Sequence, residues 1–168
     1  MRNLILIATV ALILAFCQPG PTASELASKY KSNPDAFEHL SRMIKEDTRN
    51  NDYFVVGLDH IGDYWEYLGK WTKDHDYKTK LLLPDVLKAV GLTQNRYDEY
   101  KQLFSSTGSE RISFYVPQNL VTVLVYRSGL VGSGCYGTIN WSNTHHSTSV
   151  KHEITELGNG WYLEYECT

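Results

Sequence analysis

The chain has 168 residues, and 19 acidic residues against 16 lysines and arginines give it a formal net charge of -3. Charges of both signs are mixed along the sequence, which excludes a general electrostatic attraction to nucleic acid or to an anionic membrane surface. Without the apolar N-terminal segment, about 150 residues remain, which is enough for one domain with a hydrophobic core.

The N-terminal segment has the form of an export signal. Residues 4–16 are an apolar run that follows Arg2 and ends at Cys17, after which come Gln18, Pro19 and Gly20. The run is too short for an ordinary transmembrane helix, and the prolines stop it from continuing. We therefore predict a signal peptide and processing region at 1–24, a single globular domain at 25–168, and export to the periplasm, cell envelope or extracellular space.

Two kinds of processing are compatible with this segment. Leu14-Ala15-Phe16-Cys17 resembles a bacterial lipobox, in which the cysteine is lipidated, but Phe16 stands where that motif needs a small residue. Ordinary signal peptidase needs small residues one and three positions before its cut, and cleavage before Gln18 or before Glu25 satisfies this rule. Cys17 is thus a lipidation candidate, and membrane contact is expected only through such an anchor.

Cys135 and Cys167 are the thiols that remain after processing, and we predict that they form a disulfide in the oxidising compartment. Two free buried thiols are the alternative. Side-chain alternation supports the pairing, since antiparallel strands that place Cys135 opposite Cys167 also place Trp141 opposite Trp161. No C-x-x-C motif is present, so the disulfide is expected to be structural rather than redox-active.

The first part of the domain is predicted to be helical. Asn33 as N-cap and Pro34 in the first turn begin a helix that extends to about Arg49. The segment 52–57 is ambiguous between strand and helix, and the spacing of apolar residues favours a helix over 61–71. Two further helices are expected at 84–90 and 93–103, packed as a hairpin.

The second part is predicted to be β-structure because the apolar period changes to two after Glu110. Strands are expected at 112–116, 120–126, 135–141, 150–157 and 161–166, with a turn at 158–160. The sequence therefore predicts an α+β fold in which N-terminal helices pack on one face of a four- to five-stranded antiparallel sheet.

The motifs that suggest chemistry are placed in unsuitable contexts. Residues 132–137 match G-x-G-x-x-G, but a strand follows them where a dinucleotide site needs a helix. The histidines and their acidic neighbours have no zinc-ligand spacing, and no G-x-S-x-G segment occurs. We accordingly expect no catalytic residue, metal or cofactor. The histidines and acidic neighbours considered for such a site are His145, His146 and His152, Asp59-His60, and Asp74-His75-Asp76.

Asn140-Trp141-Ser142 forms a glycosylation sequon. It matters only in a eukaryotic source, and only if Asn140 faces outward on the side opposite Ile139.

Four short stretches carry a resemblance to a known group of proteins. They are Leu92-Thr93-Gln94-Asn95-Arg96-Tyr97, Glu110-Arg111-Ile112, Arg127-Ser128-Gly129-Leu130-Val131-Gly132 and Gly160-Trp161-Tyr162-Leu163. The C-terminal half resembles small exported bacterial proteins, often lipoproteins, of uncharacterised function. This resemblance implies a bacterial envelope location, and it brings no catalytic residues.

The leading functional hypothesis is an exported, non-enzymatic protein-binding module, of immunity or inhibitor type. Twelve tyrosines and four tryptophans suit either a core or an interface. The expected binding face is the side of the last strands opposite the disulfide, where aromatic and acidic residues would suit a basic protein partner. This candidate face comprises Tyr136, Thr138, Asn140, Tyr162, Glu164 and Glu166.

Two alternatives remain open. The first is a small envelope hydrolase with a His/Asp site at the junction of helices and sheet, built from Asp59, His60, Asp74, His75 and His152. A cleft that brings two of these residues within hydrogen-bond reach would favour it. The second is a structural envelope lipoprotein without a dedicated ligand.

Overall fold

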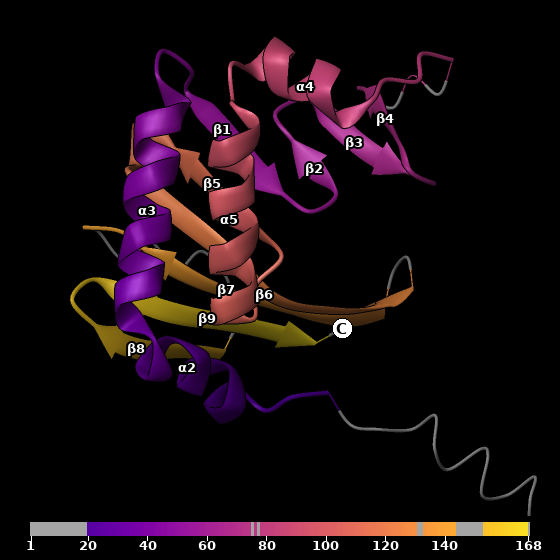
Figure 1. Cartoon of the computed structure of the whole chain (residues 1–168). Helices are drawn as coiled ribbons and strands as arrows, with labels where there is room; N and C mark the ends of the chain where they lie inside the picture. Colours follow the sequence, from indigo (N-terminus) through magenta and orange to yellow (C-terminus); the bar gives the residue numbers. More distant parts are fainter. Residues whose placement is uncertain (1–19, 75, 77, 131–132, 144–152, 168) are drawn as a thin grey trace, which may run out of the picture.

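The computed structural model describes residues 20–74, 76, 78–130, 133–143 and 153–167. Within these ranges, four helices lie on a nine-stranded antiparallel sheet (Figure 1). The strand order across the sheet is β4-β3-β2-β1-β5-β6-β7-β9-β8. The α+β class is confirmed, and the prediction of four to five strands is wrong.

Three of the four helices were predicted. They are α3 (Pro34–Thr48), α4 (Leu83–Val90) and α5 (Gln94–Thr107). The first helix, α2 (Ala23–Ser32), was not predicted because its beginning overlaps the segment assigned to processing. Its start is well specified, since Thr22 and Glu25 form a capping box that satisfies two backbone N–H groups.

The predicted helix over 61–71 is wrong, because this region forms short strands. They are β1 (Tyr53–Gly57), β2 (His60–Ile61), β3 (Tyr64–Tyr67) and β4 (Lys70–Lys73). Gly62, Leu68 and Gly69 have φ values of 56°, 50° and 77°, which interrupt any helix and reverse the chain twice. The apolar spacing that suggested a helix therefore arises from successive hairpins.

The C-terminal strands lie where the alternation predicted them. They are β5 (Arg111–Tyr115), β6 (Leu120–Leu130), β7 (Ser133–Trp141), β8 (Glu153–Gly158) and β9 (Trp161–Cys167), with a 3-10 turn at Val116–Gln118 before β6. The start of the predicted strand 150–157 lies outside the described residues. Residues 133–137 of the G-x-G-x-x-G segment form the beginning of β7, where a dinucleotide site would need a helix, and Gly132 lies outside the described residues.

The predicted register of β7 and β9 is confirmed. Cys135 pairs with Cys167 and Trp141 with Trp161, and a disulfide of 2.05 Å joins the two cysteines. Gly137 lies opposite Tyr165, and a side chain at Gly137 would collide with Leu26 of α2. The absence of a side chain at Gly137 thus lets α2 approach the sheet closely.

All four helices lie to one side of the sheet's central strands, and α3 and α5 run side by side across them (Figure 1). The core between these layers includes Phe37, which is fully buried, and Trp161, which is 1 % exposed. Their ring centroids are 6.0 Å apart, and Tyr30 packs against both. Across the described ranges, no helix combines the length and the apolar composition needed to cross a membrane.

Candidate functional site

The turn between β3 and β4 is the most unusual surface feature of the described chain. Tyr67 pairs with Lys70, and the two residues between them, Leu68 and Gly69, both have positive φ, as in a type I′ turn. That turn prefers Asn-Gly, because most side chains are disfavoured in the left-handed region. Of the five non-glycine residues with positive φ in the described ranges, Leu68 alone is aliphatic.

Leu68 is also 84 % exposed, more than any other large hydrophobic residue among those described. Its neighbour Tyr67 is 57 % exposed. An aliphatic side chain at this position carries conformational strain and gains no burial within the folded chain. Fold stability therefore does not explain its presence, and we define Tyr67, Leu68, Gly69 and Lys70 as the hairpin tip.

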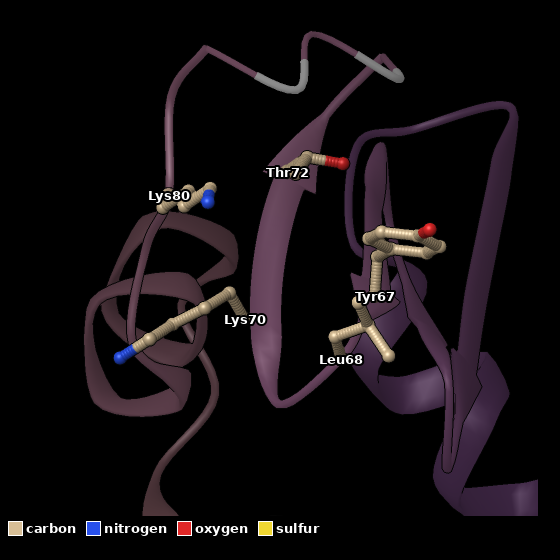
Figure 2. Close-up of a pocket in the computed structure, with 5 residues that line it drawn as sticks. All are labelled: Tyr67, Leu68, Lys70, Thr72 and Lys80. Carbon is tan, nitrogen blue, oxygen red and sulfur yellow. The ribbon is translucent and has the colours of Figure 1, made fainter.

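A cavity of about 330 Å³ lies beside the hairpin tip, lined by Tyr67, Leu68, Lys70, Thr72 and Lys80 (Figure 2). Tyr67 and Lys70 pair across β3 and β4, and Thr72 follows Lys70 on the same side of β4. Lys80 comes from the segment that precedes α4. Reciprocal backbone hydrogen bonds between Trp71 and Leu81 hold that segment against the outer edge of β4.

The cavity combines positive charge with an unsatisfied buried hydroxyl. Within the described ranges, neither Lys70 nor Lys80 has a salt-bridge partner. Thr72 is 2 % exposed, and its Oγ1 atom has no hydrogen-bond partner. Residues 70–80 contain four lysines and two aspartates in a chain whose net charge is negative, so the excess positive charge is local.

The predicted binding face is less accessible than expected. Its six residues do share one side of the sheet, since Tyr136 pairs with Glu166, Thr138 with Glu164, and Asn140 with Tyr162. However, Thr138, Asn140 and Tyr162 are each 5 % exposed or less, whereas Tyr136 is 49 % exposed. Half of the members of this face are therefore buried in the fold, and its role in binding stays a prediction.

Asn140 is turned to the side opposite Ile139, as the alternation requires, but it is only 2 % exposed. Its Nδ2 atom donates hydrogen bonds to Thr138 Oγ1 at 2.9 Å and to Glu164 Oε2 at 3.1 Å. The sequon asparagine is thus an internal hydrogen-bond donor in the folded chain and is not presented for modification.

Asp59 is bound by two arginines. Arg111 Nη2 donates to Asp59 Oδ1 at 2.9 Å, and Arg127 Nη2 donates to Oδ2 at 2.8 Å. Burial raises the pKa of Asp59, but these hydrogen bonds and positive charges outweigh burial and hold the pKa below its usual value. A bulge between Leu124 and Tyr126 in β6 places Arg127 on this side of the sheet.

His60 lies next to Asp59 in the chain but has different partners. Its ring stacks on Trp65 with a centroid distance of 3.6 Å, and its Nδ1 atom is buried without a hydrogen-bond partner. Burial, and then the positive charge of Arg111, lower the pKa of His60 to about 4. His60 is therefore neutral at pH 7.

The described residues do not assemble the His/Asp site of the hydrolase hypothesis. The carboxylate of Asp59 accepts its hydrogen bonds from arginines rather than orienting His60. Asp74 ends the β3–β4 region in the left-handed conformation, whereas His75 and His152 lie outside the described residues, as do His145 and His146. In the ranges that the structure describes, no three His, Cys, Asp or Glu side chains form a group able to hold a metal ion.

Within the described residues, the chain is an α+β protein with a large antiparallel sheet and a surface cavity at one edge hairpin. Comparison with protein-family models, with curated proteins and with solved structures gives no match. Sequence reasoning missed Leu68, Thr72 and Lys80. The usable signal was Gly69 alone, since it follows the aromatic stretch 64–67 and glycine readily adopts the positive φ of a tight turn.

Proposed function

We propose that this protein is an exported, non-enzymatic module that binds another protein through the hairpin tip and the adjoining cavity. The observation that carries the proposal is Leu68, which is 84 % exposed and held in the left-handed region. Left-handed backbone costs an aliphatic residue about 1 to 2 kcal/mol. Burying a leucine side chain against a partner contributes about 1.5 to 3 kcal/mol, which offsets the cost of the left-handed backbone once the complex forms.

The surroundings of Leu68 also suit a binding site. Tyr67 and Leu82 are 57 % and 54 % exposed, tyrosine is enriched at the centres of protein interfaces, and exposed apolar patches mark interaction sites. The bonds between Trp71 and Leu81 fix the hairpin against the segment before α4, so little order has to be gained on binding. These features support an inhibitor or immunity protein, which acts by covering a surface of its partner.

Export of the chain remains part of the proposal. The disulfide between Cys135 and Cys167 supports it, because disulfides persist in oxidising compartments. The apolar segment at 4–16 and the resemblance of the C-terminal half to small exported bacterial proteins point in the same direction.

The test uses the oxidised chain beginning at Gln18 and a phage-displayed library of random 12-residue peptides. Peptides enriched on the wild-type chain are synthesised, and their affinities are measured by calorimetry. Leu68→Asn should weaken binding by about tenfold or more while raising the thermal midpoint, because asparagine is favoured in this turn and leucine is not.

Val116→Asn is the matched control, since Val116 is 41 % exposed and lies in the 3-10 turn that follows β5, a strand separated from β3 and β4 by β2 and β1. It should leave peptide affinity unchanged. Failure to enrich any peptide, or equal affinity for the wild type and Leu68→Asn, would overturn the proposed binding site.

A further inference from the structure

We infer that the cavity beside the hairpin tip recognises an acidic segment of the protein partner, with aspartate or glutamate carboxylates bound by the lysines that line it, Lys70 and Lys80. This inference rests on the proposed function and adds the chemistry of the partner. It differs from the sequence-based expectation of a basic partner, which depended on a sheet face that is half buried.

The two lysines supply the charge for this recognition. They come from separate segments, β4 and the chain before α4, and both line the same cavity (Figure 2). Within the described ranges no acidic side chain pairs with either of them, so both ammonium groups are available to a ligand. A carboxylate bound by an ammonium group accepts charge-assisted hydrogen bonds, which are stronger than neutral ones.

Thr72 provides a second and independent indication of a polar ligand. Its hydroxyl is buried, has no partner, and points toward the side of the cavity where Tyr67 lies (Figure 2). A buried hydroxyl without a hydrogen bond is costly, and buried polar groups in proteins nearly always have a partner. A ligand oxygen that enters the cavity would accept the hydrogen bond from Thr72 Oγ1.

The remaining walls are apolar and define what stands beside the carboxylate. Tyr67 and Leu68 line the same cavity as the lysines, and Leu82 is exposed in the adjoining segment before α4. An acidic residue next to an aromatic or aliphatic one in the partner would satisfy both the lysines and this apolar wall. A volume of about 330 Å³ accommodates side chains of this size.

The net charge of -3 argues against a nucleic acid or an anionic membrane as the occupant. Long-range repulsion by the whole chain opposes large polyanions, whereas a single carboxylate responds mainly to the two nearby lysines. The observations therefore favour a protein segment with isolated acidic residues.

The experiment analyses the peptides selected on the wild-type chain. Enriched sequences should contain an aspartate or glutamate beside an aromatic or aliphatic residue. Replacing that acidic residue by its amide should weaken binding by about three- to tenfold. Lys70→Gln and Lys80→Gln should each do the same and reduce the dependence of affinity on salt concentration, and Thr72→Val should weaken binding without altering that salt dependence.

Lys31→Gln is the control, because Lys31 lies on α2 away from the cavity. It should leave affinity and salt dependence unchanged. If Leu68→Asn abolishes binding while both lysine variants bind normally, or if the selected peptides are basic or uncharged, the acidic-segment inference is overturned and the proposed binding function stands. Retention of the chain by phosphatidylglycerol vesicles through Lys70 and Lys80 would also overturn the inference.

Discussion

At the residue scale, Gly57 determines where the Arg111 side chain lies on the side of the sheet away from the helices. Arg111 pairs with Gly57, and a Cβ atom at Gly57 would lie 2.8 Å from Arg111 Cγ. The arginine side chain therefore packs directly over the glycine, which brings its guanidinium to Asp59 and to within 5.2 Å of the Trp65 ring centroid.

His60, on the same side of the sheet, makes stability depend on pH. Its pKa is about 4 in the folded chain and near 6.5 when unfolded, so between these values the unfolded state binds more protons. The free energy of unfolding should fall as the pH drops from 6.5 to 4, by up to about 3 kcal/mol from this residue. Urea unfolding of the wild type and of His60→Phe at several pH values should show a shallower fall in the variant.

Phenylalanine keeps a ring stacked on Trp65 and cannot be protonated, so it isolates the titration from the packing. The carboxylates with lowered pKa values remain in both proteins and are cancelled in the comparison. Identical pH profiles for the two proteins would show that His60 is protonated equally in the folded and unfolded states.

At the element scale, Arg96 joins α5 to α3. Its Nε atom lies 2.8 Å from Asp47 Oδ2 and its Nη2 atom 2.8 Å from Glu46 Oε2. Tyr100 also donates its hydroxyl to Asp47 Oδ2 at 2.8 Å. One carboxylate thus accepts hydrogen bonds from two positions one helical turn apart on α5.

Removal of this carboxylate should loosen the contact between the two helices. We expect Asp47→Ala to lower the free energy of unfolding by about 2 to 3 kcal/mol, because Arg96 and Tyr100 lose their shared partner in a part-buried position. Urea denaturation checks this. Asp98→Ala, which removes an exposed pair with Lys101, should leave the midpoint unchanged, and equal effects of the two substitutions would contradict the assignment.

The cap of α2 distinguishes between the processing sites suggested by the sequence. Cleavage before Glu25 would remove Thr22, whose hydroxyl accepts the hydrogen bond from Glu25 N, and would also remove the buried Ala23. A chain that starts at Glu25 should be less stable than one that starts at Gln18, by about 1 to 2 kcal/mol. We therefore expect mass spectrometry of the exported protein to find its first residue at Cys17 or Gln18.

At the scale of the whole molecule, the disulfide joins β7 to β9, the strands whose register was predicted from alternation. It closes a loop with a sequence separation of 32. Replacing both cysteines by serine should lower the free energy of unfolding by about 3 kcal/mol, because the unfolded chain regains the freedom of that loop. Thermal unfolding with and without reductant should show that reduction destabilises the wild type only, and equal sensitivity of the variant would contradict this.

The sequence predicted the structure best where it carried a direct local signal, either side-chain alternation along a strand or residues typical of a helix start. Alternation over the last strands predicted the pairing of Cys135 with Cys167, and Asn33 with Pro34 predicted the start of α3. It failed over 61–71 because apolar residues separated by tight turns imitate helical spacing, and the turns depend on φ values that leucine rarely adopts.

The sequence by itself determined the apolar N-terminal segment, the α+β class, the disulfide and the pairing of the last strands, because each follows from local composition or from alternation along a strand. Only the tertiary structure decided which residues line the cavity of the candidate site. The cavity gathers the hairpin tip, Thr72 and Lys80 through the contact of Trp71 with Leu81, which no local pattern specifies. Burial likewise depends on packing between distant segments, and for that reason Tyr162 lies inside the fold while Leu68 lies in water.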